Sequence, residues 1–263
     1  MKQVQLVEVI TKRLKRMKKL SGEVLEKFDM DDIHDLRVEY KKLRSLIRLI
    51  QLEANAPKLK VPGKLKSVYE TGGPVRDIQL FIPRLSPYFY HFPTQVFLNG
   101  LEQKLATAKQ ELKRAIEQTS FEKVEESVIG SLPDHLNDEA VKKFVEKKIQ
   151  AVKSGLSNIQ NDEDLHSVRK QLKDLINVIK VYRNEWKLPF PVNTGISEDD
   201  LNEAGTLLGE YNDLCFAINF LQLNRDIILP IEEKQILESI EKWWLNEKES
   251  KHKEVLKKLT SIL

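Results

Sequence analysis

The feature that most constrains the fold is a stretch that occurs twice, each time with the apolar spacing of an α-helix. The segments HDLRVEYKKLRSLIRLIQ and HSVRKQLKDLINVIKVYR align without a gap at an offset of 132 residues. The aligned pairs are His34 with His166, Arg37 with Arg169, Lys41 with Lys173, and Arg48 with Lys180. Because self-similarity of this kind indicates repeated structural units, we expect two similar halves.

A second pair of segments, GGPVRDIQLFI and LGEYNDLCFAI, follows the first in each half. Gly73 aligns with Gly209 and Asp77 with Asp213, both at an offset of 136 residues. A small insertion between two helices would produce this change in offset. We therefore place one repeat at residues 1–130 and the other at residues 131–263, and we expect the two to form one domain together.

Apolar residues recur with a helical period along the chain, and no alternating strand pattern of useful length appears. Helices are expected at about 2–20, 31–53, 64–85 and 94–118, and again at about 138–155, 162–186, 198–221 and 230–261. Asp31 or Asp32 is placed to cap the second helix, while Pro57 and the segment SPYFYHFP indicate breaks. We predict an all-α protein of two pseudo-symmetric four-helix bundles.

The composition of the 263 residues limits the classes of function. Charged residues make up 32%, but the net charge is only +3, so any anion site must come from local clustering of cations. The single cysteine, Cys215, excludes a disulfide framework and suits a reducing compartment. No signal peptide is recognised, and no run approaches the roughly 18 apolar residues of a membrane span. We expect a cytoplasmic protein with no membrane partner.

Basic residues share one face of each repeated helix. At about 100° per residue, offsets of 0, 3, 7, 10 and 14 fall within an arc of about 80°. The first basic stripe consists of His34, Arg37, Lys41, Arg44 and Arg48. The second basic stripe consists of His166, Arg169, Lys173, Lys180 and Arg183, with Ile176 interrupting it. Both stripes lack the interleaved glutamates of ordinary solvated helix faces, which favours a surface that binds an anion.

Two further cations lie on the apolar faces of the helices that precede the stripes. Arg13 is placed among Leu6 and Val9, and Lys148 among Val141 and Phe144. A long cation in such a position usually extends to solvent. The alternative is that it lines an anion-binding groove between helices.

The pattern H-x-x-R-x-x-x-K, present at His34 and again at His166, resembles the CHAD (conserved histidine α-helical domain) family. The VRD segment at 75–77 and the YND segment at 211–213 fit the same pattern, and the resemblance covers essentially the whole chain. It implies two helical bundles related by a pseudo-twofold axis, binding of inorganic polyphosphate along basic residues, and a location at polyphosphate granules. This chain departs from the family at Ile176, where a basic residue is usual, and at Asn212, which stands opposite Arg76.

The predicted function is therefore non-catalytic binding of inorganic polyphosphate by the two stripes, together with Arg76, Arg13 and Lys148. A linear polyanion needs a row of cations, with arginine as a bidentate donor and lysine as a point charge. We expect no cofactor and no metal. We find no combination of nucleophile, base and orienting residue, so we do not predict an enzyme.

Two alternatives stay open. One is a metal-dependent phosphohydrolase that uses the histidines and the pair Asp77 and Asp213, although no third ligand is evident. The other is a helical nucleic-acid-binding protein, although aromatic residues are not interleaved with the stripes as base stacking would require. The sequence does not specify the polyphosphate chain length, the oligomeric state, or a role in storage, targeting or regulation.

Overall fold

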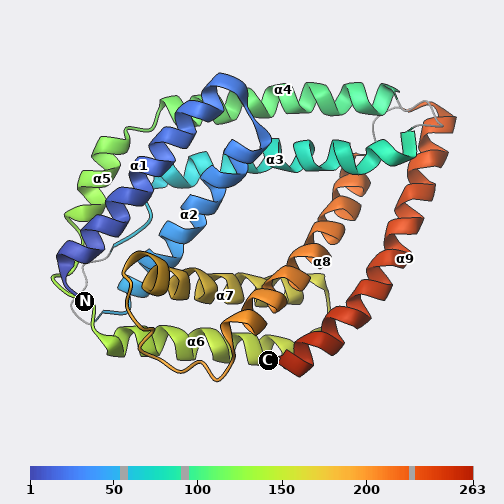
Figure 1. Ribbon diagram of the computed structural model, residues 1–263. Helices are drawn as coiled ribbons and strands as arrows, with labels where there is room; N and C mark the ends of the chain where they lie inside the picture. The colour runs from blue at the N-terminus through green and yellow to red at the C-terminus, as the bar shows by residue number, and fades with distance from the viewer. Residues whose placement is uncertain (54–58, 90–94, 225–228, 263) are drawn as a thin grey trace.

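The protein is described by a computed structural model over residues 1–53, 59–89, 95–224 and 229–262 (Figure 1). Within these ranges it is helical, with one isolated β-bridge between Lys2 and His135. The helices are α1 (Gln3–Lys27), α2 (Met30–Ile50), α3 (Gly63–Phe89), α4 (Gln95–Glu117), α5 (Phe121–Ile129), α6 (Asp138–Ser157), α7 (Asp162–Lys180), α8 (Glu198–Asn224) and α9 (Ile231–Ile262). A π-helical turn, Val181–Glu185, extends α7. The all-α prediction is confirmed.

The helices pack in an order that occurs twice. α1 packs on α2 and α3 on α4, and in the same way α6 packs on α7 and α8 on α9. α2 also contacts α3, as α7 contacts α8. The short helix α5, which we did not predict, packs on α1. This recurring order is what two similar halves of four long helices require.

The halves meet where α2 contacts α7. There the Asn177 side chain donates a hydrogen bond of 3.2 Å to Ser45 Oγ. These two residues are 132 positions apart, which is the offset of the repeated segments. Two equivalent residues contact each other at a twofold axis, so this bond lies where a pseudo-twofold axis through the two repeats is expected.

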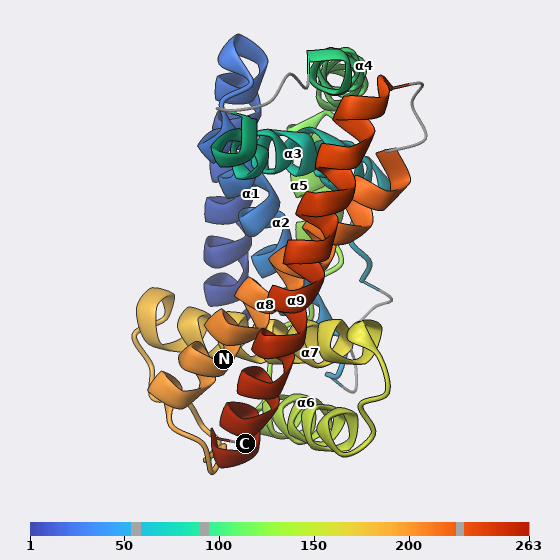
Figure 2. The same cartoon turned by 90° about the vertical axis from the view of Figure 1, so that its right-hand side faces the viewer.

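The halves meet a second time, where α3 and α4 pack against α8 and α9. The Phe81 ring lies 4.5 Å from the Phe220 ring and 6.0 Å from the Trp244 ring, measured between centroids. α9 runs along α8 from the α4 end of the molecule to the α6 end (Figure 2). The main core, like this smaller one, contains buried side chains from both halves. The repeats therefore fold against each other rather than as separate units.

Some helix boundaries differ from the prediction for local reasons. α2 begins three residues after Lys27, and its N-cap is Asp29, whose side chain accepts from the amides of Asp31 and Asp32. The prediction that Asp31 or Asp32 is the cap was wrong. Both lie in the first turn, where carboxylates stabilise the positive end of the helix dipole.

α3 is longer than predicted and contains the TGGP segment, residues 71–74. It continues through Pro74, Pro83 and Pro87, each of which lacks an amide hydrogen for the helix. Buried Phe81 and Leu85 anchor this part of α3 in the smaller core, which compensates for the missing hydrogen bonds. The predicted break at SPYFYHFP therefore begins too early. Pro57 and residues 90–94 lie outside the described residues.

A candidate anion-binding site at the central opening

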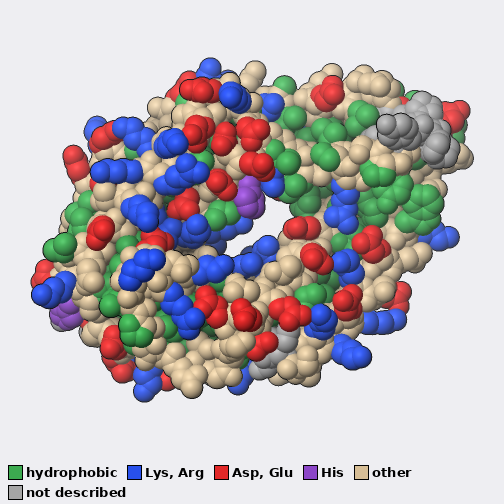
Figure 3. All heavy atoms as spheres, viewed as in Figure 1, with side chains coloured by type: hydrophobic (Ala, Val, Ile, Leu, Met, Phe, Trp, Pro, Cys, Tyr) green, Lys and Arg blue, Asp and Glu red, His purple; other side chains and the backbone are tan. Residues whose placement is uncertain are grey.

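An opening lies between the two contacts that join the halves. Figure 3 shows it between α2, α3, α7 and α8, with lysine and arginine side chains on its α2 and α7 sides and a histidine at its edge. The basic stripes lie on α2 and α7. The cations gathered beside the opening therefore come from both repeats.

Arg37 is held in one position by α3. Its guanidinium donates to the carbonyl oxygen of Tyr69 and lies over the Tyr69 ring, with Cζ 4.4 Å from the ring centroid. Gly72 and Gly73 pass close to the same side chain. A cation held by a hydrogen bond and by an aromatic face loses little further freedom when it binds an anion. The guanidinium of Arg37 is thus held in one position by α3.

Arg44 belongs to the same aromatic arrangement. The rings of Tyr40 and Tyr69 stack with centroids 4.3 Å apart. Cζ of Arg44 lies 5.9 Å from the first ring and 5.8 Å from the second. The Nε–H of Arg44 has no hydrogen-bond partner among the described residues. These tyrosines, which our sequence reasoning missed, are covered by arginines, so they are not open platforms for nucleic-acid bases.

Lys41 shows that the two stripes converge. Burial, followed by the positive charges of Arg37, Arg169 and Arg44, lowers the pKa of Lys41 to about 8. Arg169 belongs to α7, in the other half of the molecule. A like charge lowers the pKa of a lysine when it lies nearby, and α2 and α7 are in contact. The second stripe therefore approaches the first at the level of Lys41.

The second stripe has fewer cations but a similar arrangement. Arg169 lies against Gly209 of α8, and Lys173 lies against Gly205. Burial, followed by Arg169 and Lys180, lowers the pKa of Lys173. Ile176, at the position that corresponds to Arg44, is buried in the main core. At the interruption predicted from the sequence, the second half therefore has a core residue where the first half has a cation.

The two histidines have different neighbours. Burial, then Arg76 and Lys41, lowers the pKa of His34. Burial and Lys170 also lower the pKa of His166, whose Nδ1 donates to Asn212 Oδ1. Both are therefore less protonated at neutral pH than an isolated histidine, as expected beside cations. Arg76 lies near His34 in the first half, and Asn212 lies near His166 in the second half.

Two carboxylates share this region with the cations. Burial raises the pKa of Asp77, and Arg37, Lys41 and Arg76 oppose that change. Asp213 adds a further rise, which places the two aspartates near each other. Neither has an ion-pair partner within 4 Å among the described residues. They therefore add negative charge to the region without a close ion pair to any one cation.

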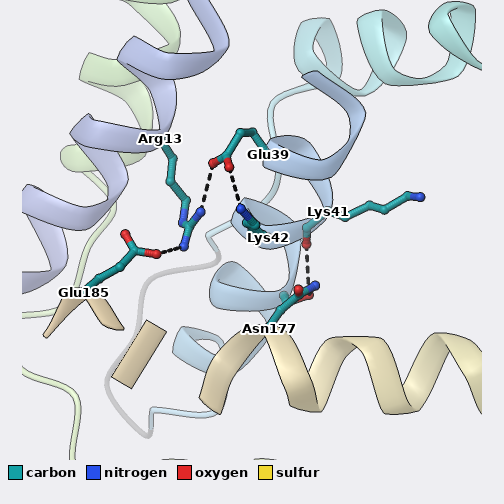
Figure 4. A network of polar contacts seen from close by, with 7 residues as sticks. Arg13, Glu39, Lys41, Lys42, Asn177 and Glu185 are labelled. Atoms are coloured by element: carbon teal, nitrogen blue, oxygen red, sulfur yellow. Dashed lines mark hydrogen bonds and ion pairs between the residues drawn. The ribbon is translucent and has the colours of Figure 1, made fainter. Parts of the chain in front are cut away.

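Four of the predicted site residues already pair with carboxylates of the protein. Arg13, with 4% of its side chain exposed, donates to Glu39 at 2.9 Å and to Glu185 (Figure 4). Figure 4 also shows Lys41 pointing away from this network. Arg13 neither extends to solvent nor faces a ligand, because its two carboxylate partners hold it among the helices. We therefore leave it out of the candidate site.

Asp174 is the carboxylate that pairs with two more of these cations, Lys148 and Arg48. It is 2% exposed and accepts from Lys148 at 2.8 Å, from Arg48 at 2.6 Å and from Ser45 at 2.8 Å. Arg183, whose side chain is 54% exposed, pairs with Glu198 at the surface. Because each of these cations already has a carboxylate partner, the candidate site reduces to the others. It consists of His34, Arg37, Lys41, Arg44, Arg76, His166, Arg169, Lys173 and Lys180.

Comparison with known proteins agrees with this architecture. The family model described as CHAD domain matches residues 8–222. The chain belongs to the CHAD family.

Solved structures show the same fold for this CHAD domain at low sequence identity. The crystal structure of the CHAD domain from the plant Ricinus communis superposes with a TM-score of 0.69 at 16% identity, covering 94% of this chain and 86% of that chain. PptA from Streptomyces chartreusis superposes with a TM-score of 0.71 at 13% identity, covering 98% of this chain and 99% of that chain. A comparison with curated protein sequences gave no match.

Two further observations concern other kinds of site. Among the described residues, no three histidine, cysteine, aspartate or glutamate side chains come together as ligands for a metal ion. Of the helices in the described ranges, none combines the length and the apolar character needed to cross a bilayer.

Proposed function

We propose that this CHAD domain binds inorganic polyphosphate without cleaving it, along the cations that meet beside the central opening. The observation that carries the proposal is that α2 packs on α7, where Arg169 of α7 lowers the pKa of Lys41 of α2. Two cationic rows that meet offer a continuous path to a flexible chain that is negatively charged at every phosphate. Rows that faced separate regions of solvent would offer only two short sites.

The chemistry of the residues suits such a ligand. Arg37 and Arg169 can each present a planar pair of N–H donors to phosphate oxygens, and Lys41 and Lys173 supply point charges. Burial and repulsion between neighbouring cations make the unliganded site electrostatically unfavourable, as the lowered pKa of Lys41 indicates. A polyanion relieves that repulsion, so the free energy of binding gains from the crowding of the cations.

The experiment that tests the proposal measures binding and turnover together. The protein is titrated with long-chain polyphosphate over a salt series, while released inorganic phosphate is measured with and without a chelator. For about six contacts, the log–log salt slope should be about −4 if polyphosphate behaves like a single-stranded nucleic acid. We expect saturable binding, no phosphate release and no effect of the chelator.

Other outcomes would support other functions. Release of phosphate that depends on a divalent cation would indicate a metal-dependent phosphohydrolase. RNA of equal charge that displaces polyphosphate at a lower concentration would indicate a nucleic-acid-binding protein. Either result would overturn the proposal.

A further inference from the structure

We propose that Gly73 and Gly205 are positioning residues, which leave room for Arg37 and Lys173 so that these cations face the ligand. The inference rests on the proposed function, because it assigns a role to residues that themselves touch no phosphate. It concerns the α3 and α8 helices, which support the basic stripes of α2 and α7.

At Gly73, the space that a side chain would fill is already occupied. A Cβ atom built there would lie 3.2 Å from Nη1 of Arg37, and 3.8 Å from Cζ and Nη2. The guanidinium also contacts the carbonyl oxygen and the ring of Tyr69. The α3 backbone at Gly73 therefore forms one wall of the position that Arg37 occupies.

Gly205 has the corresponding role for the second stripe. A Cβ atom there would lie 3.1 Å from Nζ of Lys173 and 3.5 Å from its Cε. It would also lie 3.1 Å from Cδ1 of Ile176. In both halves, then, a glycine of the supporting helix touches the charged end of a stripe residue.

A positive φ angle does not account for these glycines, although Gly73 directly precedes Pro74, whose ring disfavours a Cβ atom on the preceding residue of a helix. Neither has a positive φ angle, and both lie within long helices, where glycine is a poor residue and alanine the best. Close approach of another group is the other physical reason for glycine. At Gly73 the atom that approaches is the end of a flexible cationic side chain, which a methyl group would displace. At Gly205 the buried Cδ1 of Ile176 approaches as closely as Nζ of Lys173.

A double-mutant cycle tests the inference for Gly73. Polyphosphate affinity is measured for the parent, Gly73→Ala, Arg37→Ala and the double variant, with circular dichroism and thermal unfolding of each. We expect Gly73→Ala to bind about fivefold more weakly, and to have no further effect on affinity when Arg37 is already alanine. Thermal unfolding reports separately on the contact of the new methyl group with the Pro74 ring. Gly205→Ala and Lys173→Ala make the equivalent cycle.

Gly22→Ala is the matched control. Gly22 lies in α1, and nothing lies within 4 Å of a Cβ atom built there. This variant should bind polyphosphate like the parent. It should gain helix stability, because alanine favours a helix more than glycine does.

The possible results separate this inference from the proposed function. If the parent fails to bind polyphosphate, the proposed function is wrong. If the parent binds and Arg37→Ala weakens binding, but Gly73→Ala binds like the parent, only the positioning role is wrong. An equal loss from Gly73→Ala with and without the Arg37 guanidinium would also overturn it, because the glycine would then act through another contact.

Discussion

Raising the pH above 8 should weaken polyphosphate binding, because Lys41 loses its charge there. The pKa of Lys41 falls from 10.5 to about 8 in the free protein. This lowering corresponds to roughly 3 kcal/mol that opposes the charged form, at 1.36 kcal/mol for each pKa unit. Its first cause is burial, followed by Arg37, Arg169 and Arg44.

The direction of the effect follows from which form binds. The charged amine attracts polyphosphate, and a bound polyanion raises its pKa again, so binding is linked to proton uptake. Below pH 8 Lys41 is already charged, so its contribution to the affinity for polyphosphate is complete. Above pH 8 a proton must be taken up, and affinity should fall by about tenfold for each further pH unit until the pKa of the bound state is reached.

Isothermal titration at pH 7, 8 and 9, in buffers of different ionisation enthalpy, measures both affinity and proton uptake. The matched variant is Lys41→Arg, which keeps its charge throughout this range. In this variant, affinity should fall much less between pH 7 and pH 9. Any fall that is left would come from Lys173, whose pKa is also lowered. Equal affinity of the parent at pH 7 and pH 9, or an identical decline in Lys41→Arg, would refute the reasoning.

Two other substitutions probe the charges around the site. Asp77→Asn should tighten polyphosphate binding by roughly threefold to tenfold in a titration at fixed salt, because it removes a negative charge near the cations; weaker binding would mean that this carboxylate positions them. Asp174→Ala should lower the free energy of unfolding by about 3–5 kcal/mol in urea, because it leaves Lys148 buried and unpaired. The control is Glu249→Ala, which breaks an exposed pair with Lys253 and should unfold like the parent. If Asp174→Ala also unfolded like the parent, the buried pair with Lys148 would not stabilise the protein.

Stability at acid pH should also depend on Asp174 and its partners. The pKa of Asp174 is lowered overall, since hydrogen bonding and charge from Lys148, with Arg48 and Ser45, outweigh burial. Its contribution to stability is therefore complete above its ordinary pKa of 3.8 and is lost as the pH falls through the lower folded value. The parent should lose more stability than Asp174→Asn between pH 4 and pH 2.

The helical period predicted which residues share a face, and that part of the site could be read from the sequence. His34, Arg37 and Lys41 lie on one side of α2 because their spacing follows 3.6 residues per turn. The offset of 132 residues also predicted that the halves are alike, and the Ser45–Asn177 bond has that same separation. These features are local or periodic, so one sequence contains them.

The partners of the cations could not be read in the same way. Arg13 pairs with Glu185, 172 positions along the chain, and Arg48 pairs with Asp174, 126 positions along. No spacing rule connects such residues, because their proximity depends on how the two repeats pack. Tyr69 was missed for the same reason, since it reaches Arg37 from another helix.

The most direct test of the central claim is the salt dependence of polyphosphate binding by the parent, Arg37→Ala, Arg169→Ala and the control Lys15→Ala. If one phosphate chain contacts both stripes, each arginine variant binds more weakly, with a salt slope shallower by about 0.7, and keeps the helical circular dichroism of the parent. Lys15, exposed on α1, should leave affinity and slope almost unchanged. Parent-like affinity and slope in both arginine variants would contradict a shared site.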